Sequence, residues 1–123
     1  MGNITRDKFN PMSQSIDLAF LVAKAATLKE EKAKIFVDVA SLAYNVAMVN
    51  RLANIQKDYI SICCIIDQVA RLRGYCTQEE YILAQECQHH VAECEVELRK
   101  HKVMTDIDFT SLIVSGLSML MKK

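Results

Sequence analysis

The feature that most constrains this chain is its shortage of turn-forming residues. Its 123 residues include one proline and three glycines. Sheet proteins of this size need many tight turns, which rely on glycine, proline and asparagine. Hydrophobic residues make up 51% of the chain, which is enough for one packed core. The sequence therefore predicts an all-α fold of a few long helices, forming a single domain over residues 1–123.

The N-terminal part predicts an irregular lead-in followed by an apolar helix. Residues 1–12 are polar and mixed in charge, and we expect them to be irregular. A first helix is expected over residues 16–26, with Ser13 or Ser15 as its N-cap, because a hydroxyl there accepts an orphan backbone N–H. This helix is apolar on nearly every face, so other helices or a partner should cover it.

The next segment predicts a second and a third helix with uncertain boundaries. Thr27 and Glu30 fit a capping box, so a helix is expected to start there, although the first helix could instead run on. A third helix is expected over residues 56–73, after a break near Asn50 or Asn54. The second helix should carry two apolar stripes at helical spacing: Ile35, Val39, Leu42, Val46, Val49 and Ala53, and Phe36, Ala40, Ala43 and Ala47.

The clearest boundary in the sequence lies between the third and fourth helices. Gly74 suits the position after a helix end, because glycine adopts positive φ at no steric cost. Thr77 and Glu80 form a second capping-box pattern, which predicts a fourth helix over residues 78–102. Two apolar stripes should pack together here: Tyr59, Ile62, Ile66 and Val69, and Ala84, Cys87, Val91, Cys94 and Leu98. The expected architecture is a bundle of four to five helices in which the third and fourth form an antiparallel hairpin.

A last helix is expected over residues 111–121, capped by Asp108 or Thr110. It is again apolar on most faces. Apolar helices at both ends supply more hydrophobic surface than a chain of this size can hide, and exposed apolar patches usually mark interfaces. We therefore expect a homo-oligomer or a protein partner. In the alternative, the two terminal helices form the centre of a monomeric bundle.

Cysteine and histidine residues near the middle of the fourth helix could bind a metal. Cys87 and His90 are three residues apart, and an antiparallel hairpin would bring Cys63 or Cys64 level with Cys87, so that Cys63, Cys87 and His90 could form a cluster. This set has only three ligands and no CxxC pair. Because Cys87 and Cys94 lie on the apolar stripe, we favour the interpretation that they are small buried hydrophobes.

No feature of the sequence predicts an enzyme or a cofactor. No P-loop, dinucleotide-binding fingerprint, Gly-x-Ser-x-Gly or His-Glu-x-x-His motif is present. Basic and acidic residues balance at 15 each, which argues against a nucleic-acid partner. The longest apolar stretch, residues 16–26, is too short to span a membrane and contains Lys24. Five cysteines, an odd number, favour a reducing, cytoplasmic location.

The sequence thus predicts a non-enzymatic module that self-associates or binds another protein through apolar helical faces. An adaptor, an inhibitor, a chaperone and an assembly factor would all fit. The alternative hypothesis is a metal- or thiol-dependent bundle that uses Cys63, Cys87 and His90.

Overall fold

The computed structural model describes residues 17–41, 46–101 and 108–121, and this part of the chain is helical without any strand. The all-α prediction is therefore confirmed. The predicted lead-in over residues 1–12 and the predicted caps Ser13 and Ser15 lie outside the described residues. The four helices are α1 (Leu18–Ser41), α2 (Val46–Arg73), α3 (Gln78–Lys100) and α4 (Asp108–Met121).

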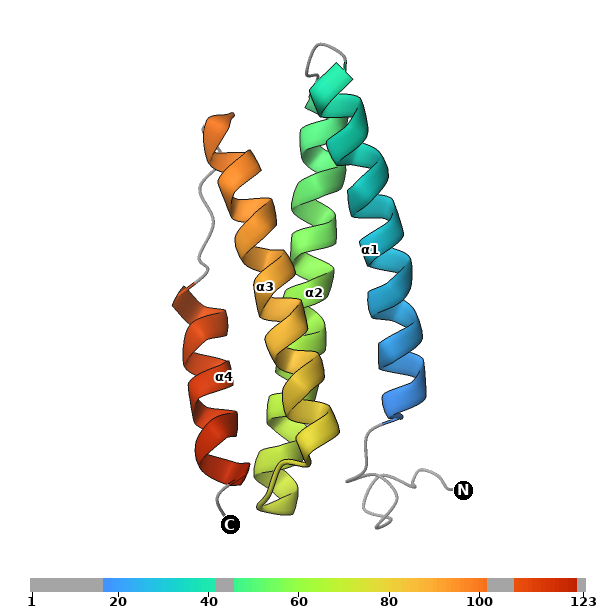
Figure 1. Ribbon diagram of the computed structural model, residues 1–123. Coiled ribbons are helices and arrows are strands. Elements are labelled where there is room, and N and C mark those ends of the chain that lie inside the picture. The colour runs from blue at the N-terminus through green and yellow to red at the C-terminus, as the bar shows by residue number, and fades with distance from the viewer. Residues whose placement is uncertain (1–16, 42–45, 102–107, 122–123) are drawn as a thin grey trace, which may run out of the picture.

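The helices run alternately up and down, with α2 and α3 at the centre (Figure 1). Helices α2 and α3 are antiparallel and make the most extensive contact in the molecule. Helix α4 packs against both of them on one side. Helix α1 lies on the other side, where it packs mainly on α2 and touches α3 much less. Since α1 and α3 run parallel with little contact, this side of the molecule is more open.

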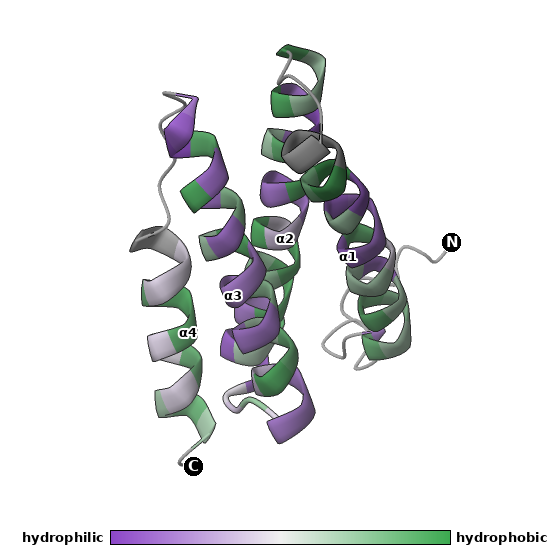
Figure 2. Ribbon diagram, turned by 45° about the horizontal axis from the view of Figure 1, so that its top comes forward, coloured by the Kyte–Doolittle hydropathy of each residue, from purple (hydrophilic) through white to green (hydrophobic). Residues whose placement is uncertain are grey.

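The core forms where the apolar stripes of the helices meet. The stripe predicted for the fourth helix is confirmed, because Ala84, Cys87, Val91, Cys94 and Leu98 are all fully buried in α3. In α2, Tyr59, Ile62 and Ile66 are buried against them, while Val69 is only partly covered. Helix α1 contributes Leu21, Leu28 and Ile35. Figure 2 shows hydrophilic residues gathered on α3, whereas α4 is neutral or hydrophobic through residues 110–120.

Two predicted helix breaks are wrong. Helix α1 continues through Thr27, whose hydroxyl donates to the Ala23 carbonyl oxygen at 3.2 Å instead of capping a new helix. Helix α2 likewise continues through Asn50 and Asn54. Both side chains are exposed, so neither asparagine interrupts the packing of the helix against the core. The stripes predicted for the second helix are consequently divided between α1 and α2. The side chains of Val39, Ala40, Leu42 and Ala43 lie outside the described part.

The predicted boundary between α2 and α3 is confirmed in detail. Gly74 has a φ of +94°, and its N–H donates to the Ala70 carbonyl oxygen at 2.8 Å. Thr77 and Glu80 form a reciprocal capping box: the Glu80 N–H donates to the Thr77 hydroxyl at 3.2 Å, and the Thr77 N–H donates to the Glu80 carboxylate at 3.0 Å. Arg73 forms an ion pair with the same carboxylate. These contacts join the end of α2 to the start of α3.

The two terminal helices differ in their starts from the prediction. Helix α1 begins beside Asp17, whose carboxylate accepts from the Phe20 N–H at 3.1 Å. Helix α4 begins at Asp108, three residues before the predicted start. Both helices expose large apolar side chains, including Phe20 at 62%, Leu112 at 71% and Met119 at 70%. None of the described helices combines the length and apolar character needed to cross a membrane.

Candidate functional site

An open groove of about 900 Å³ lies between α1 and α3. We call it the α1–α3 groove. One bank belongs to α1 and the other to α3, so the groove follows the parallel course of the two helices. The α1 bank is formed by Val22, Ala25, Ala26, Lys29, Lys32, Ala33 and Phe36, and the α3 bank includes Leu83, Glu86, His89, His90 and Glu93. The lining is therefore mainly apolar and small on α1 and mainly polar on α3.

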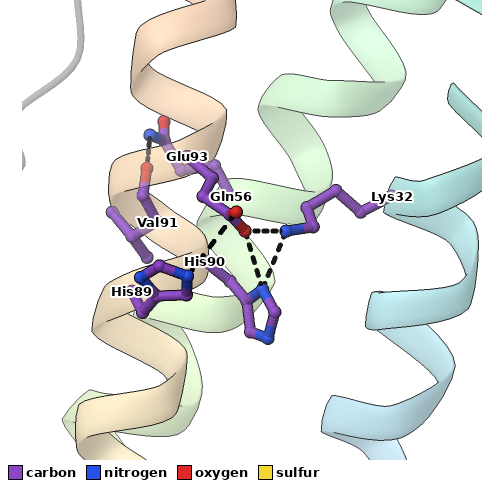
Figure 3. A network of polar contacts seen from close by, with 6 residues as sticks. All are labelled: Lys32, Gln56, His89, His90, Val91 and Glu93. Carbon is purple, nitrogen blue, oxygen red and sulfur yellow. Dashed lines mark hydrogen bonds and ion pairs between the residues drawn. The ribbon is translucent and has the colours of Figure 1, made fainter. Parts of the chain in front are cut away.

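A polar network centred on Lys32 connects the two banks (Figure 3). The Lys32 ammonium donates to Nδ1 of His90 at 2.8 Å and forms an ion pair with Glu93. His89 Nε2 lies 3.5 Å from the other oxygen of Glu93. The Lys32 side chain is 8% exposed, whereas the Glu93 side chain is 40% exposed. The cation is thus inside the protein and its carboxylate partner is at the rim of the groove.

The contact with Lys32 defines the protonation state of His90. An ammonium group can only donate and a carboxylate can only accept, and Nδ1 of His90 lies 2.8 Å from the Lys32 nitrogen and 3.3 Å from the Glu93 carboxylate. The shorter contact, with Lys32, favours a neutral imidazole whose Nδ1 accepts and whose proton is on Nε2. Burial lowers the pKa of His90 below its usual value, and the nearby Lys32 charge lowers it further, while Glu93 opposes both. The hydrogen bond from Lys32 holds the pKa of Glu93 below its usual value. Around His90 the network therefore combines a lysine cation, a carboxylate anion and a neutral imidazole, and His89 adds a second imidazole at its exposed edge.

Tyr59 and Gln56 support this network from α2. The Tyr59 ring stacks on the His90 ring, with centroids 4.8 Å apart and planes 18° from parallel. Burial raises the pKa of Tyr59 well above its usual value, and its hydroxyl has no hydrogen-bond partner among the described residues. The Gln56 amide donates to the Val91 carbonyl oxygen at 3.0 Å, which fixes α2 against α3 at the same level. His90 is therefore held between three helices.

The structure brings together two of the three candidate metal ligands. Cys63 and Cys87 are fully buried and lie beside each other, and the Cys63 thiol donates to the Ala84 carbonyl oxygen at 3.6 Å. The described residues include no group of three or more Cys, His, Asp or Glu side chains that could hold a metal ion. His90 instead contacts Lys32 and Tyr59. Cys63 and Cys87 occupy the positions of core hydrophobes.

Three of the buried thiols are also poor nucleophiles. Burial raises the pKa of Cys94 to about 12 and that of Cys76 to about 11. The hydrogen bond with Cys63 and burial both raise the pKa of Cys87. Since the thiolate is the reactive form, none of these three groups is activated for covalent chemistry. The site is thus an open groove with a fixed polar network across its two banks.

Lys32 is the site residue that the sequence reasoning missed. The inward-facing positions of α1 follow the steps of a heptad pattern: Leu21, Leu28, Lys32 and Ile35 are buried, and Ala25 is partly buried. A lysine therefore interrupts an apolar stripe at a core position. This interruption was visible in the sequence, and charged residues at such positions are rarely buried unless they are paired. Its partners, however, depend on how closely α1 approaches α3.

Comparisons with known proteins add no assignment to this geometry. No protein-family model matches the chain, and neither the curated proteins nor the solved structures that were searched include a significant match.

Proposed function

We propose that this chain is a non-enzymatic protein-interaction module whose binding surface is the α1–α3 groove. In this proposal the α2–α3 hairpin is the rigid centre of a helical bundle, and α1 provides a movable bank. The observation that carries it is the groove itself, an open, mainly apolar depression of about 900 Å³ between two helices that contact each other little. Contiguous apolar depressions with a few fixed polar groups are the usual form of binding sites.

Two further features support binding rather than catalysis. His90 already accepts a hydrogen bond from Lys32 on the nitrogen that faces the groove network, so this nitrogen is not available as a base. Two of the buried thiols, Cys87 and Cys94, have raised pKa values and therefore remain protonated. Five free cysteines also fit the proposal that the protein works in a reducing compartment such as the cytoplasm. The metal-dependent alternative gains no support from the arrangement of Cys63, Cys87 and His90.

Two matched substitutions of alanine by glutamate test the proposed function. Ala26→Glu places a charge inside the groove, whereas Ala92→Glu places the same charge on an exposed position of α3 that does not line it. Immobilised wild-type protein and each variant are incubated with extract of the native host, and the retained proteins are identified by mass spectrometry. We expect wild type and Ala92→Glu to retain one or more proteins, copies of this chain included, and Ala26→Glu not to retain them.

The proposal would be wrong if all three baits retained the same proteins. It would also be wrong if wild type retained none, sedimented as a monomer and left the fluorescence of an apolar-surface dye unchanged. Circular dichroism of each variant checks that the helices remain formed.

A further inference from the structure

We propose that the α1–α3 groove binds the same groove of a second copy, in a dimer whose two-fold axis runs parallel to the helices. This inference rests on the proposed function and names the partner. In a closed up-and-down bundle the fourth helix packs between the first and the third. Here α4 packs on the opposite side, against α2 and α3, so none of the four described helices closes the face between α1 and α3.

The charges on the two banks decide how two grooves can meet. The α1 bank carries Lys29 and the α3 bank carries Glu86, and both residues are exposed. Neither forms an ion pair with another described residue, unlike Lys32 and Glu93, which neutralise each other. Each copy therefore offers one unneutralised positive bank and one unneutralised negative bank. Such a face complements itself if a rotation places unlike banks opposite each other.

Only one of the two face-to-face rotations achieves this. A two-fold axis along the groove places the partner's α1 over α3, whereas an axis across the groove places α1 over α1 and the partner's Lys29 near Lys29. Like charges placed opposite each other disfavour the second arrangement. The first arrangement pairs Lys29 with the partner's Glu86 and, by symmetry, repeats the pair once.

The register of α1 and α3 also fits the first arrangement. Lys32 contacts residues 58 and 61 positions later in the chain, so an α1 residue lies level with the α3 residue about 60 positions later. An axis parallel to the helices preserves these levels. The partner's Lys29 then lies about three residues, or roughly 5 Å along the axis, from Glu86, which is within the reach of a lysine side chain.

The remaining lining is compatible with a helix-on-helix contact. Ala25, Ala26 and Ala33 leave room for close approach at the middle of the α1 bank, while Val22 and Phe36 supply apolar surface toward its ends. The equal numbers of acidic and basic residues mean that two copies do not repel each other through net charge. The dimer would close into a bundle of two α1 and two α3 helices.

Charge-swap variants test the dimer directly. The full-length chain is measured by analytical ultracentrifugation at about 1 to about 100 µM. We expect wild type to sediment with the mass of two 13.9 kDa chains at the upper end. Lys29→Glu and Glu86→Lys should each weaken dimerisation at least about tenfold, because two attractive pairs become two repulsive ones. The double variant on one chain, and an equimolar mixture of the two single variants, should both restore it. Ala92→Glu is the control that should dimerise like wild type.

Each other outcome overturns the inference in a recognisable way. A wild-type chain that remains monomeric at about 100 µM shows that the partner is not a second copy. If such a monomer still captures another protein through a contact sensitive to Ala26→Glu, the proposed function survives without the dimer. A wild-type dimer that neither single variant weakens forms through a different face, such as the exposed side of α4. If the single variants weaken the dimer but neither the double variant nor the mixture restores it, the effect does not come from the pairing of Lys29 with Glu86.

Discussion

At the residue scale, the Lys32 network joins α1 to the rest of the molecule through groups of very different exposure. Lys32 is the buried partner and Glu93 the half-exposed one. The cost of removing either partner therefore depends on which charge is left behind. A carboxylate at the rim can hydrate, but an ammonium inside the protein cannot.

Lys32→Met and Glu93→Gln should consequently have unequal effects. We expect Lys32→Met to change the free energy of unfolding by less than about 1 kcal/mol, because an apolar chain of similar length fills the site and Glu93 remains hydrated. Glu93→Gln should lower it by about 1–3 kcal/mol, because it leaves the buried Lys32 charge without an anionic partner, beside only the neutral groups of His90 and Phe36 among the described residues. Urea denaturation measures both values, and a reversed order would contradict this account.

His90 should make stability depend on pH. Its pKa is lower in the folded protein than its ordinary value of 6.5, so the unfolded chain binds protons more strongly. The His90 contribution to the free energy of unfolding is therefore complete above about pH 6.5 and is lost as pH falls below it. Protonation would place an imidazolium beside Lys32 on α1, next to Tyr59 of α2 and with His89 and Glu93 on its own helix.

His90→Gln should flatten the dependence of the urea midpoint on pH between about pH 8 and about pH 5.5. Glu93 and Glu80, whose pKa values are lowered from 4.5, do not titrate in this range. His89→Gln is the matched control, because the His89 side chain is largely exposed. The account fails if both variants keep the wild-type slope.

At the scale of elements, the connection between α2 and α3 is the part that local sequence determines most fully. Burial alone would raise the pKa of Glu80, but hydrogen bonds from Arg73 and Thr77 outweigh it and lower the pKa below its usual value. The Arg73 guanidinium also lies over the Tyr75 ring, 4.5 Å from its centroid. Every group involved lies within eight residues of the others, so these contacts can form before the rest of the fold.

Gly74→Ala should lower the free energy of unfolding by about 1–2 kcal/mol. A Cβ at this position meets no atom within 4 Å, so the cost comes from the positive φ alone and not from a clash. Gly74→Asn, which tolerates positive φ better, should cost less than Gly74→Ala. Equal losses for the two variants in urea denaturation would indicate a steric cause and contradict the prediction.

The sequence predictions succeeded where a feature depends on contacts between neighbours in the chain and failed where it depends on contacts between distant residues. Gly74, Thr77 and the α3 stripe were predictable because each depends on neighbours in the chain. Thr27 misled because a threonine hydroxyl can cap a helix or donate to the carbonyl four residues back within one. The pairing of Lys32 with Glu93, 61 residues away, depends on the packing of α1, which no local pattern determines.

At the scale of the whole molecule, α2, α3 and α4 pack closely against one another, and α1 is the helix with the least contact to the rest. In a monomer, α1 should therefore open more often than the other helices. If the dimer forms as proposed, α1 and the facing side of α3 gain protection in it, while α4 does not.

Hydrogen exchange followed by mass spectrometry should reveal this as a dependence on protein concentration. Peptides covering residues 22–36 and 83–93 should exchange more slowly at about 100 µM than at about 1 µM, and peptides of α4 should exchange at the same rate. Lys29→Glu should remove the difference. Uniform slowing across all helices would argue against the groove as the dimer interface.

The rates at which the cysteines react can report how this fold opens. Of the five, Cys64 alone is partly accessible, while Cys63, Cys76, Cys87 and Cys94 are buried between helices. A thiol-specific reagent added to the native protein should therefore label one site quickly and the other four only as the helices separate. Because Cys63 on α2 contacts Cys87 on α3, the rate at which these two thiols are labelled reports how often α2 and α3 separate. Their rates, resolved by mass spectrometry and set beside that of Cys64, would show whether the centre of the molecule opens in one event or in steps.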